Sequence, residues 1–256
     1  MPVETANGPH AVKPIRDLLT RFTPVQKSVS DFENATLSYD ILNWTFRPHT
    51  PPPAPSTVYG SLVIRRQATP SAALYHIQQK THLIPCASLE TSQNGHAAIG
   101  GQATQLNAEL TCDLRDTPQS WTLETYRADA HGNPVPISIL REAGQNNNGQ
   151  IQSQDGAYEY QAYNTLLSHW TLPHLLMCNA LALPSTFDML QDLSVLRANQ
   201  NLIDEGPVDL DSGTYHSYAQ TGEGILPVHY LLDDRQRPQL VTFGLIAWAL
   251  TDIVNA

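Results

Sequence analysis

The sequence predicts a mainly β protein: a curved antiparallel sheet, or a partly open barrel or sandwich, with a helical segment at about residues 165–181. Three observations support this fold class. Apolar and polar residues alternate with a period of two in successive segments, which is typical of half-buried strands. Clusters of Gly, Pro, Asn and Asp separate these segments. Hydrophobic residues make up 41% of the 256-residue chain, enough for a substantial core. All-β sandwiches and barrels often reach this length as one unit, so we expect a single domain over residues 1–256.

The N-terminal part, residues 1–47, is expected to hold one helix and one strand. Residues 14–22 place apolar side chains at helical spacing after a proline, which favours a short amphipathic helix. Residues 34–46 alternate apolar and polar side chains and indicate a strand. The proline-rich stretch 48–55 can form neither a regular helix nor a central strand, because proline lacks an amide hydrogen and fixes φ. We therefore expect a stiff loop that joins this part to the main β region.

A meander of strands of about ten residues each is expected next. Leu106, Ala108 and Leu110 alternate with polar residues, which predicts one buried and one solvated face. The expected strands are residues 57–66, 72–81, 103–112, 120–127 and 135–141. Residues 144–154 are rich in Asn and Gln, so we expect an exposed loop there.

The helical segment follows this meander. We expect Asn164 to be the N-cap and one apolar stripe to consist of Leu166, Trp170, Met177 and Leu181. Pro173 interrupts this stripe, so the segment is either kinked or divided into two short helices. Residues 185–196 fit a helix or a strand, and both alternatives stay open.

The C-terminal region predicts three consecutive antiparallel strands. Residues 214–220 and 225–232 flank a glycine-rich turn at 221–224, residues 233–238 form a second turn, and residues 240–250 form a final apolar strand. This arrangement, with Tyr230-Leu231-Leu232-Asp233 and Arg237, resembles the closing hairpins of bacterial periplasmic lipoprotein-carrier-like proteins. The resemblance implies a curved sheet that wraps a helix, and it assigns no functional residue.

The formal net charge of −10 repels phosphate backbones and anionic lipid. The nearest approach to a basic patch consists of Arg65, Arg66, Arg235 and Arg237, without aromatic residues to stack on bases, so we expect no nucleic-acid partner. No stretch approaches the length of a membrane span, so we expect no membrane insertion. Residues 1–13 contain no apolar segment of the secretory type, which leaves the compartment open between the cytoplasm and an exported protein. The oligomeric state is open as well.

We expect no metal and no cofactor. The ten histidines contain no His-x-His or His-x-x-x-His pair, and no nucleophile elbow or phosphate-binding glycine motif occurs. Residues 204–211 concentrate four carboxylates, for which a solvated acidic loop is favoured over a calcium site. For Cys86, Cys112 and Cys178 we expect reduced thiols, with a bridge between Cys86 and Cys112 as the alternative.

The C-terminal hairpin carries the densest group of His and Tyr side chains. If its turn is centred on Glu223, His216 lies opposite Tyr230, and strand alternation divides the side chains into two groups. One face then carries His216, Tyr218 and Tyr230, and the other carries Tyr215, Ser217 and His229.

Two functions fit these features, and in both the expected partner is a small molecule or a glycan. The favoured one is a binding or carrier module for an apolar or amphipathic ligand, enclosed between sheet and helix and contacted by Trp170, Tyr215 and Tyr230. The alternative is a cofactor-independent hydrolase or lyase that acts on a neutral glycan-like or small-molecule substrate. Its acid–base groups would be His216, His229, Tyr218 and Tyr230.

Overall fold

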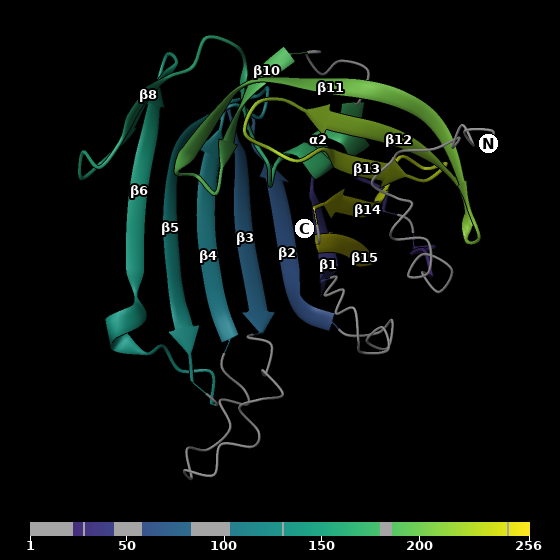
Figure 1. Cartoon of the computed structure of the whole chain (residues 1–256), viewed down its shortest axis with the longest axis horizontal. Coiled ribbons are helices and arrows are strands. Elements are labelled where there is room, and N and C mark those ends of the chain that lie inside the picture. Colours follow the sequence, from purple (N-terminus) through teal and green to yellow (C-terminus); the bar gives the residue numbers. More distant parts are fainter. Residues whose placement is uncertain are drawn as a thin grey trace, which may run out of the picture.

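The structure is a computed structural model that describes residues 23–27, 29–43, 58–82, 103–129, 131–179, 186–244 and 246–256. Within these residues the chain is mainly β, with one large curved sheet that does not close and one short α-helix (Figure 1). The predicted fold class is confirmed. No helix in the described part of the chain is long and apolar enough to cross a membrane.

The sheet contains 15 strands. The first half of the chain contributes β1 (Ala35–Asn43), β2 (Val58–Ala68), β3 (Ala73–His82), β4 (Ala103–Cys112), β5 (Pro118–Ala128), β6 (Leu140–Asn147), β7 (Gln150–Ser153) and β8 (Glu159–Gln161). The second half contributes β9 (Leu166–Ser168), β10 (Thr186–Gln191), β11 (Val195–Leu210), β12 (Gly213–Thr221), β13 (Val228–Leu232), β14 (Pro238–Phe243) and β15 (Ile246–Asn255).

The first and last described strands pair at the centre of this sheet. The order is β8-β7-β6-β5-β4-β3-β2-β1-β15-β14-β13-β12-β11-β10-β9, so β8 and β9 are its two edges. All neighbouring strands are antiparallel except β9 and β10, which are parallel.

Strand β4 illustrates why these segments form strands. Ala108 and Leu110 are buried, whereas Glu109 between them is exposed. Leu110 lies opposite the buried residues Tyr75 on β3 and Trp121 on β5. The alternation predicted for residues 103–112 is therefore present, and β3, β4 and β5 bury the same face in the core.

The sheet curls around helix α2 (Leu172–Asn179), which packs against what we call the inner face (Figure 1). The main core joins Leu172 and Leu176 of α2 to inner-face residues that include Leu37 and Tyr75. The opposite, outer face carries a second and smaller apolar cluster. Its members are Tyr215, Leu231, Leu240, Ala247 and Ala249.

A buried carboxylate holds the connection between the two edges of the sheet. Residues 162–165 run from β8 to β9. Asp188 on β10 accepts hydrogen bonds from the backbone amides of Tyr163, Asn164 and Asn199 and from the Asn164 side chain. Burial raises the pKa of Asp188, but these hydrogen bonds lower it more, so the carboxyl titrates below its ordinary value of 3.8.

The region 135–154 differs from the prediction. The strand expected at 135–141 is replaced by a 3-10 helix at Pro136–Ser138, after which β6 begins. The exposed loop expected at 144–154 is also wrong, because β6 and β7 form a hairpin there. Its turn residues Asn148 and Gly149 have φ angles of 54° and 92°, as in the type I′ turn that Asn-Gly favours.

The predicted helical segment is present but shorter than expected. Residues 166–168 form β9, which pairs with β10, and α2 begins only at Leu172. Pro173 therefore lies in the first turn of α2, where a missing amide hydrogen is tolerated, and it does not interrupt a longer helix. Asn164 is no N-cap, since its side chain bonds to Asp188 and Asn199. Of the segment left open between helix and strand, residues 186–191 are β10.

Two further expectations near the C-terminus need correction. The strand expected at 240–250 is divided between β14 and β15, so four strands close the chain. The acidic stretch 204–211 is not a loop, since all but its last residue belongs to β11, with a bulge between Asp204 and Gly206. The helix expected at 14–22, the proline-rich loop at 48–55 and Cys86 lie outside the described residues.

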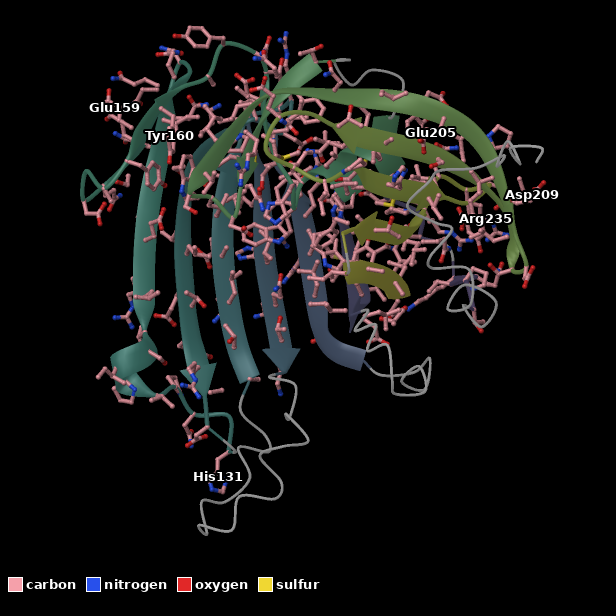
Figure 2. The ribbon with its side chains drawn as sticks, viewed as in Figure 1. His131, Glu159, Tyr160, Glu205, Asp209 and Arg235 are labelled. Carbon is pink, nitrogen blue, oxygen red and sulfur yellow. The ribbon has the colours of Figure 1, made fainter. Side chains whose placement is uncertain are left out.

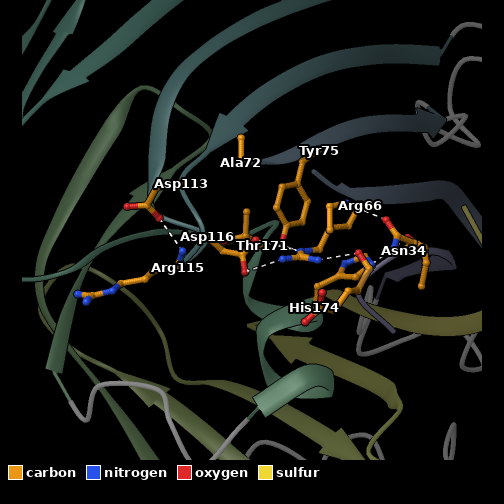
Figure 3. Close-up of polar contacts among 12 residues, drawn as sticks. Asn34, Arg66, Ala72, Tyr75, Asp113, Arg115, Asp116, Thr171 and His174 are labelled. Carbon is orange, nitrogen blue, oxygen red and sulfur yellow. Dashed lines mark hydrogen bonds and ion pairs between the residues drawn. The ribbon is translucent and has the colours of Figure 1, made fainter. Parts of the chain in front are cut away.

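Two arginines of the expected basic patch are buried in ion pairs. Arg66 Nε lies 3.0 Å from Asp116 Oδ1 (Figure 3), and Arg237 Nη2 lies 2.6 Å from Asp233 Oδ2. Each guanidinium also donates to a backbone carbonyl of the segment 23–34. These arginines fasten the N-terminal segment to the sheet and do not form a surface patch.

Candidate functional site

The hairpin of β12 and β13 carries the residues predicted to be catalytic. Tyr218 lies opposite Tyr230, and His216 lies opposite Leu232, two residues away from the register centred on Glu223. A shift of two leaves every side chain on its own face, because side-chain direction alternates with each residue. The inner face therefore carries His216, Tyr218 and Tyr230, and the outer face carries Tyr215, Ser217 and His229.

The four predicted acid–base residues do not converge on one site. On the inner face, His216 Nε2 lies 2.7 Å from Asp204 Oδ1, and its ring centroid lies 4.9 Å from that of Tyr218. His229 lies on the opposite side of the sheet. The two histidines can therefore not act on the same substrate.

On the outer face, His229 and Ser217 share one carboxylate, that of Glu205. Figure 2 labels Glu205, which belongs to β11. Glu205 Oε2 accepts hydrogen bonds from Ser217 Oγ at 2.8 Å and from His229 Nδ1 at 3.0 Å. Because both groups donate to the same oxygen, the serine hydroxyl points to the carboxylate and not to the imidazole. An activated serine nucleophile needs the opposite arrangement. The contacts tie β11 to β12 and β13.

The three residues expected to contact a ligand lie in three different environments. Trp170 is fully buried in the main core beside His169, with ring centroids 4.3 Å apart. Tyr215 lies on the outer face, with its hydroxyl 2.9 Å from that of Ser212. Tyr230 lines a cavity on the inner face, and the other two residues are not part of its lining.

This cavity, of about 450 Å³, lies on the inner face. Trp248 and Phe243 form part of its wall, together with Tyr230. Its aliphatic lining consists of Ile41, Met189, Ile225, Leu226, Val228, Val241 and Ile246. Small-ligand sites are typically of this size and mainly apolar.

Seven polar side chains complete the lining: Gln79, Thr81, His169, Gln191, Asp192, Arg197 and Gln220. The Tyr230 hydroxyl donates to Gln220 Oε1 at 3.1 Å, and burial raises the pKa of Tyr230 so that it stays protonated. Burial lowers the pKa of His169 despite the opposing effect of Asp192, so its ring is neutral at pH 7. Sequence reasoning missed most of this lining, because the residues come from separate strands and turns and share no local pattern.

A second polar cluster, which sequence reasoning also missed, is buried between α2 and the sheet (Figure 3). Asp116 accepts hydrogen bonds from Arg66 and, at 2.8 Å, from the Tyr75 hydroxyl. His174 of α2 packs edge-on against the Tyr75 ring and donates from Nε2 to the Ala35 carbonyl oxygen at 3.1 Å. Burial lowers the pKa of His174 to about 3, so the ring is neutral. None of these side chains lines the cavity, and they hold α2 in place.

In the described part of the chain, no group of three or more His, Cys, Asp or Glu side chains is arranged to hold a metal ion. Cys112 is buried, and burial raises the pKa of its thiol.

No family model matches the sequence, and no curated protein matches it. The fold is similar to that of a crystallised β-barrel-like protein of the domain of unknown function DUF1849 from Brucella abortus. The TM-score is 0.52 at 8% sequence identity, with 86% of this chain and 96% of that chain covered. A DUF1089 family protein from Pseudomonas aeruginosa matches with a TM-score of 0.39 and 10% identity, over 79% of this chain and 96% of that chain. The first likeness supports a β-barrel-like fold, and the resemblance to lipoprotein carriers stays a prediction.

Proposed function

We propose that this protein is a binding or carrier module whose inner-face cavity holds an apolar or amphipathic small ligand. The observation that carries the proposal is the cavity of about 450 Å³, lined by three aromatic, seven aliphatic and seven polar side chains. Displacement of water from these apolar side chains by an apolar ligand lowers the free energy, which favours binding.

The placement of α2 supports this proposal. The helix and the turn that precedes it occupy part of the space enclosed by the curved sheet, where Trp170, Leu172 and Leu176 are fully buried. A sheet packed solid against its helix would leave no room for a ligand. Here the cavity lined by Trp248, Phe243 and His169 remains beside this filling.

The alternative, a cofactor-independent hydrolase or lyase, has one observation in its favour: the hydrogen bond between His216 and Asp204 beside Tyr218. Neither His216 nor Tyr218 lines the cavity, and His229 faces the other side of the sheet. Binding without chemistry is therefore the function that we favour.

Titration with Nile red, a neutral dye that fluoresces in apolar surroundings, tests the proposal. Val228→Phe adds bulk at a half-buried position in the cavity lining. We expect saturable binding by the natural protein and an affinity at least about tenfold lower for this variant.

The matched control is Val254→Phe, which makes the same change at a half-buried outer-face position on β15. Its affinity should stay within about twofold of that of the natural protein. Circular dichroism verifies that both variants fold. Absence of saturable binding by the natural protein, or equal losses in the two variants, would refute the proposal.

A further inference from the structure

We infer that the ligand of this cavity carries an anionic group, a carboxylate or a phosphate, at one end of its apolar body, and that Arg197 binds this group. The inference rests on the proposed binding function and adds the chemical class of the ligand.

The pairing of β10 with β11 places Arg197 at the cavity. It lies opposite Met189, and both residues belong to the lining. Gly224, in the turn between β12 and β13, leaves room for the guanidinium: a Cβ atom at this position would lie 2.8 Å from Arg197 Nη1. Gly224 also has a φ of +75°, which residues with a side chain rarely adopt. The turn is thus shaped to accommodate the arginine at the cavity wall.

Arg197 lacks the counter-ion that comparable arginines have. Among the described residues, three arginines are buried or half-buried: Arg66, Arg197 and Arg237. Two of them are paired with an aspartate, but no carboxylate of the described residues lies within 4.0 Å of Arg197. Its Nε donates to Gln191 Oε1 at 3.1 Å, and its terminal nitrogens donate to no described group.

The terminal nitrogens of Arg197 are not among the fully buried unpaired side-chain atoms, so they remain accessible at the cavity wall and open to a ligand. Because the residue is half-buried, its charge is screened less there than on the open surface. A carboxylate or phosphate could accept two parallel hydrogen bonds from the free terminal nitrogens of Arg197. The apolar lining next to it would receive the rest of the molecule. An amphiphile with one anionic end therefore fits both parts of the cavity.

The other charged side chain of the lining, Asp192, does not neutralise Arg197. Asp192 Oδ1 lies 3.5 Å from His169 Nε2, and the Asp192 amide donates to His169 Nδ1. The net charge of −10 disfavours anions in general. A preference for an anionic ligand must therefore come from the local contact with Arg197.

Displacement of Nile red at pH 8 by four competitors tests the inference. Decanoate and decyl phosphate combine an apolar chain with an anion, decanol lacks the charge, and acetate lacks the chain. The natural protein should bind the two anionic amphiphiles at least about tenfold more tightly than decanol, and acetate should not displace the dye.

Arg197→Gln should lower the affinity for decanoate about tenfold and leave that for decanol within about twofold, so that the preference disappears. Arg197→Lys should retain part of the preference. Arg235→Gln, which changes an exposed arginine outside the cavity lining, is the matched control and should behave like the natural protein.

Equal affinities of the natural protein for decanoate, decyl phosphate and decanol would overturn the inference and leave the proposed binding function intact. A preference for anions that survives in Arg197→Gln would do the same. If neither Nile red nor decanol binds, the proposed function fails and the inference with it. Should Arg197→Gln not fold, the affinities of the natural protein for decanoate, decyl phosphate and decanol still decide whether the ligand is anionic.

Discussion

The rings of Trp248 and Phe243 meet edge to face, with centroids 5.0 Å apart and an interplanar angle of 81°. Phe243 ends β14, Trp248 lies on β15, and both residues border the cavity. The Trp248 ring also lies 6.2 Å from that of the buried Tyr39. Two central strands thus present an aromatic wall whose position is fixed by the core behind it.

Trp248 is therefore expected to report ligand binding. Of the tryptophans in the described residues, Trp121 and Trp170 are buried away from the cavity lining. Addition of decanol, which does not absorb where tryptophan does, should change the intrinsic fluorescence in a saturable way. Trp248→Phe should remove most of this change, and Trp121→Phe should retain it. The reverse result would place the ligand elsewhere.

Asp188→Ala should destabilise the protein by about 2–4 kcal/mol, because several backbone amides lose their acceptor together. Urea unfolding followed by circular dichroism measures this loss. The exposed residue Asp211 supplies the control, since Asp211→Ala should change the stability by less than about 0.5 kcal/mol. A similar small effect of Asp188→Ala would show that the connection from β8 to β9 does not depend on this carboxylate.

The sign of the pH effect at Asp188 follows from its lowered pKa. The folded state holds the Asp188 proton less tightly than the unfolded state. The contribution of Asp188 to stability is therefore complete at pH values above its ordinary pKa of 3.8. It is lost as the pH falls through the lower folded value. The difference in stability between the natural protein and Asp188→Ala should accordingly shrink only in strong acid.

His174 should destabilise the protein at mildly acidic pH. Burial lowers its pKa from 6.5 to about 3, so the unfolded chain takes up a proton that the folded state refuses. The stability of the folded state is unaffected by protonation of His174 at pH values above the unfolded-state pKa of 6.5. It declines as the pH falls below 6.5, by about 2 kcal/mol between pH 7.5 and pH 5. His174→Gln, which can keep the bond to the Ala35 carbonyl oxygen, should lose this part of the pH dependence. Denaturant curves at both pH values test this, and an unchanged pH dependence in the variant would contradict the neutral buried imidazole.

Local patterns predicted the strands better than the helix. The bounds of β4 match residues 103–112, because alternation along one segment is enough to define a half-buried strand. The spacing of Leu166 and Trp170 fits a helical stripe, and it fits a short buried strand followed by a turn equally well. The choice depends on the parallel pairing of β9 with β10, a contact between segments that no local pattern reveals.

The cavity was less accessible to sequence reasoning than the fold. Tyr230 was identified from the density of His and Tyr in its hairpin. Its grouping with His216 and Tyr218 on one face was correct, although the register was wrong by two. Arg197 and Gln191 stand next to no recognisable motif. They meet Trp248 and Gly224 only because the sheet curls, and curvature depends on packing across the whole sheet.

The most direct test of the binding function is methyl NMR spectroscopy of the protein titrated with decanol. The proposal predicts saturable shifts at the cavity residues Ile41, Val228, Val241 and Ile246, and none at the outer-face residues Leu231 and Ala247. Shifts that are largest on the outer face, or no saturable shift at the cavity methyl groups, would contradict it.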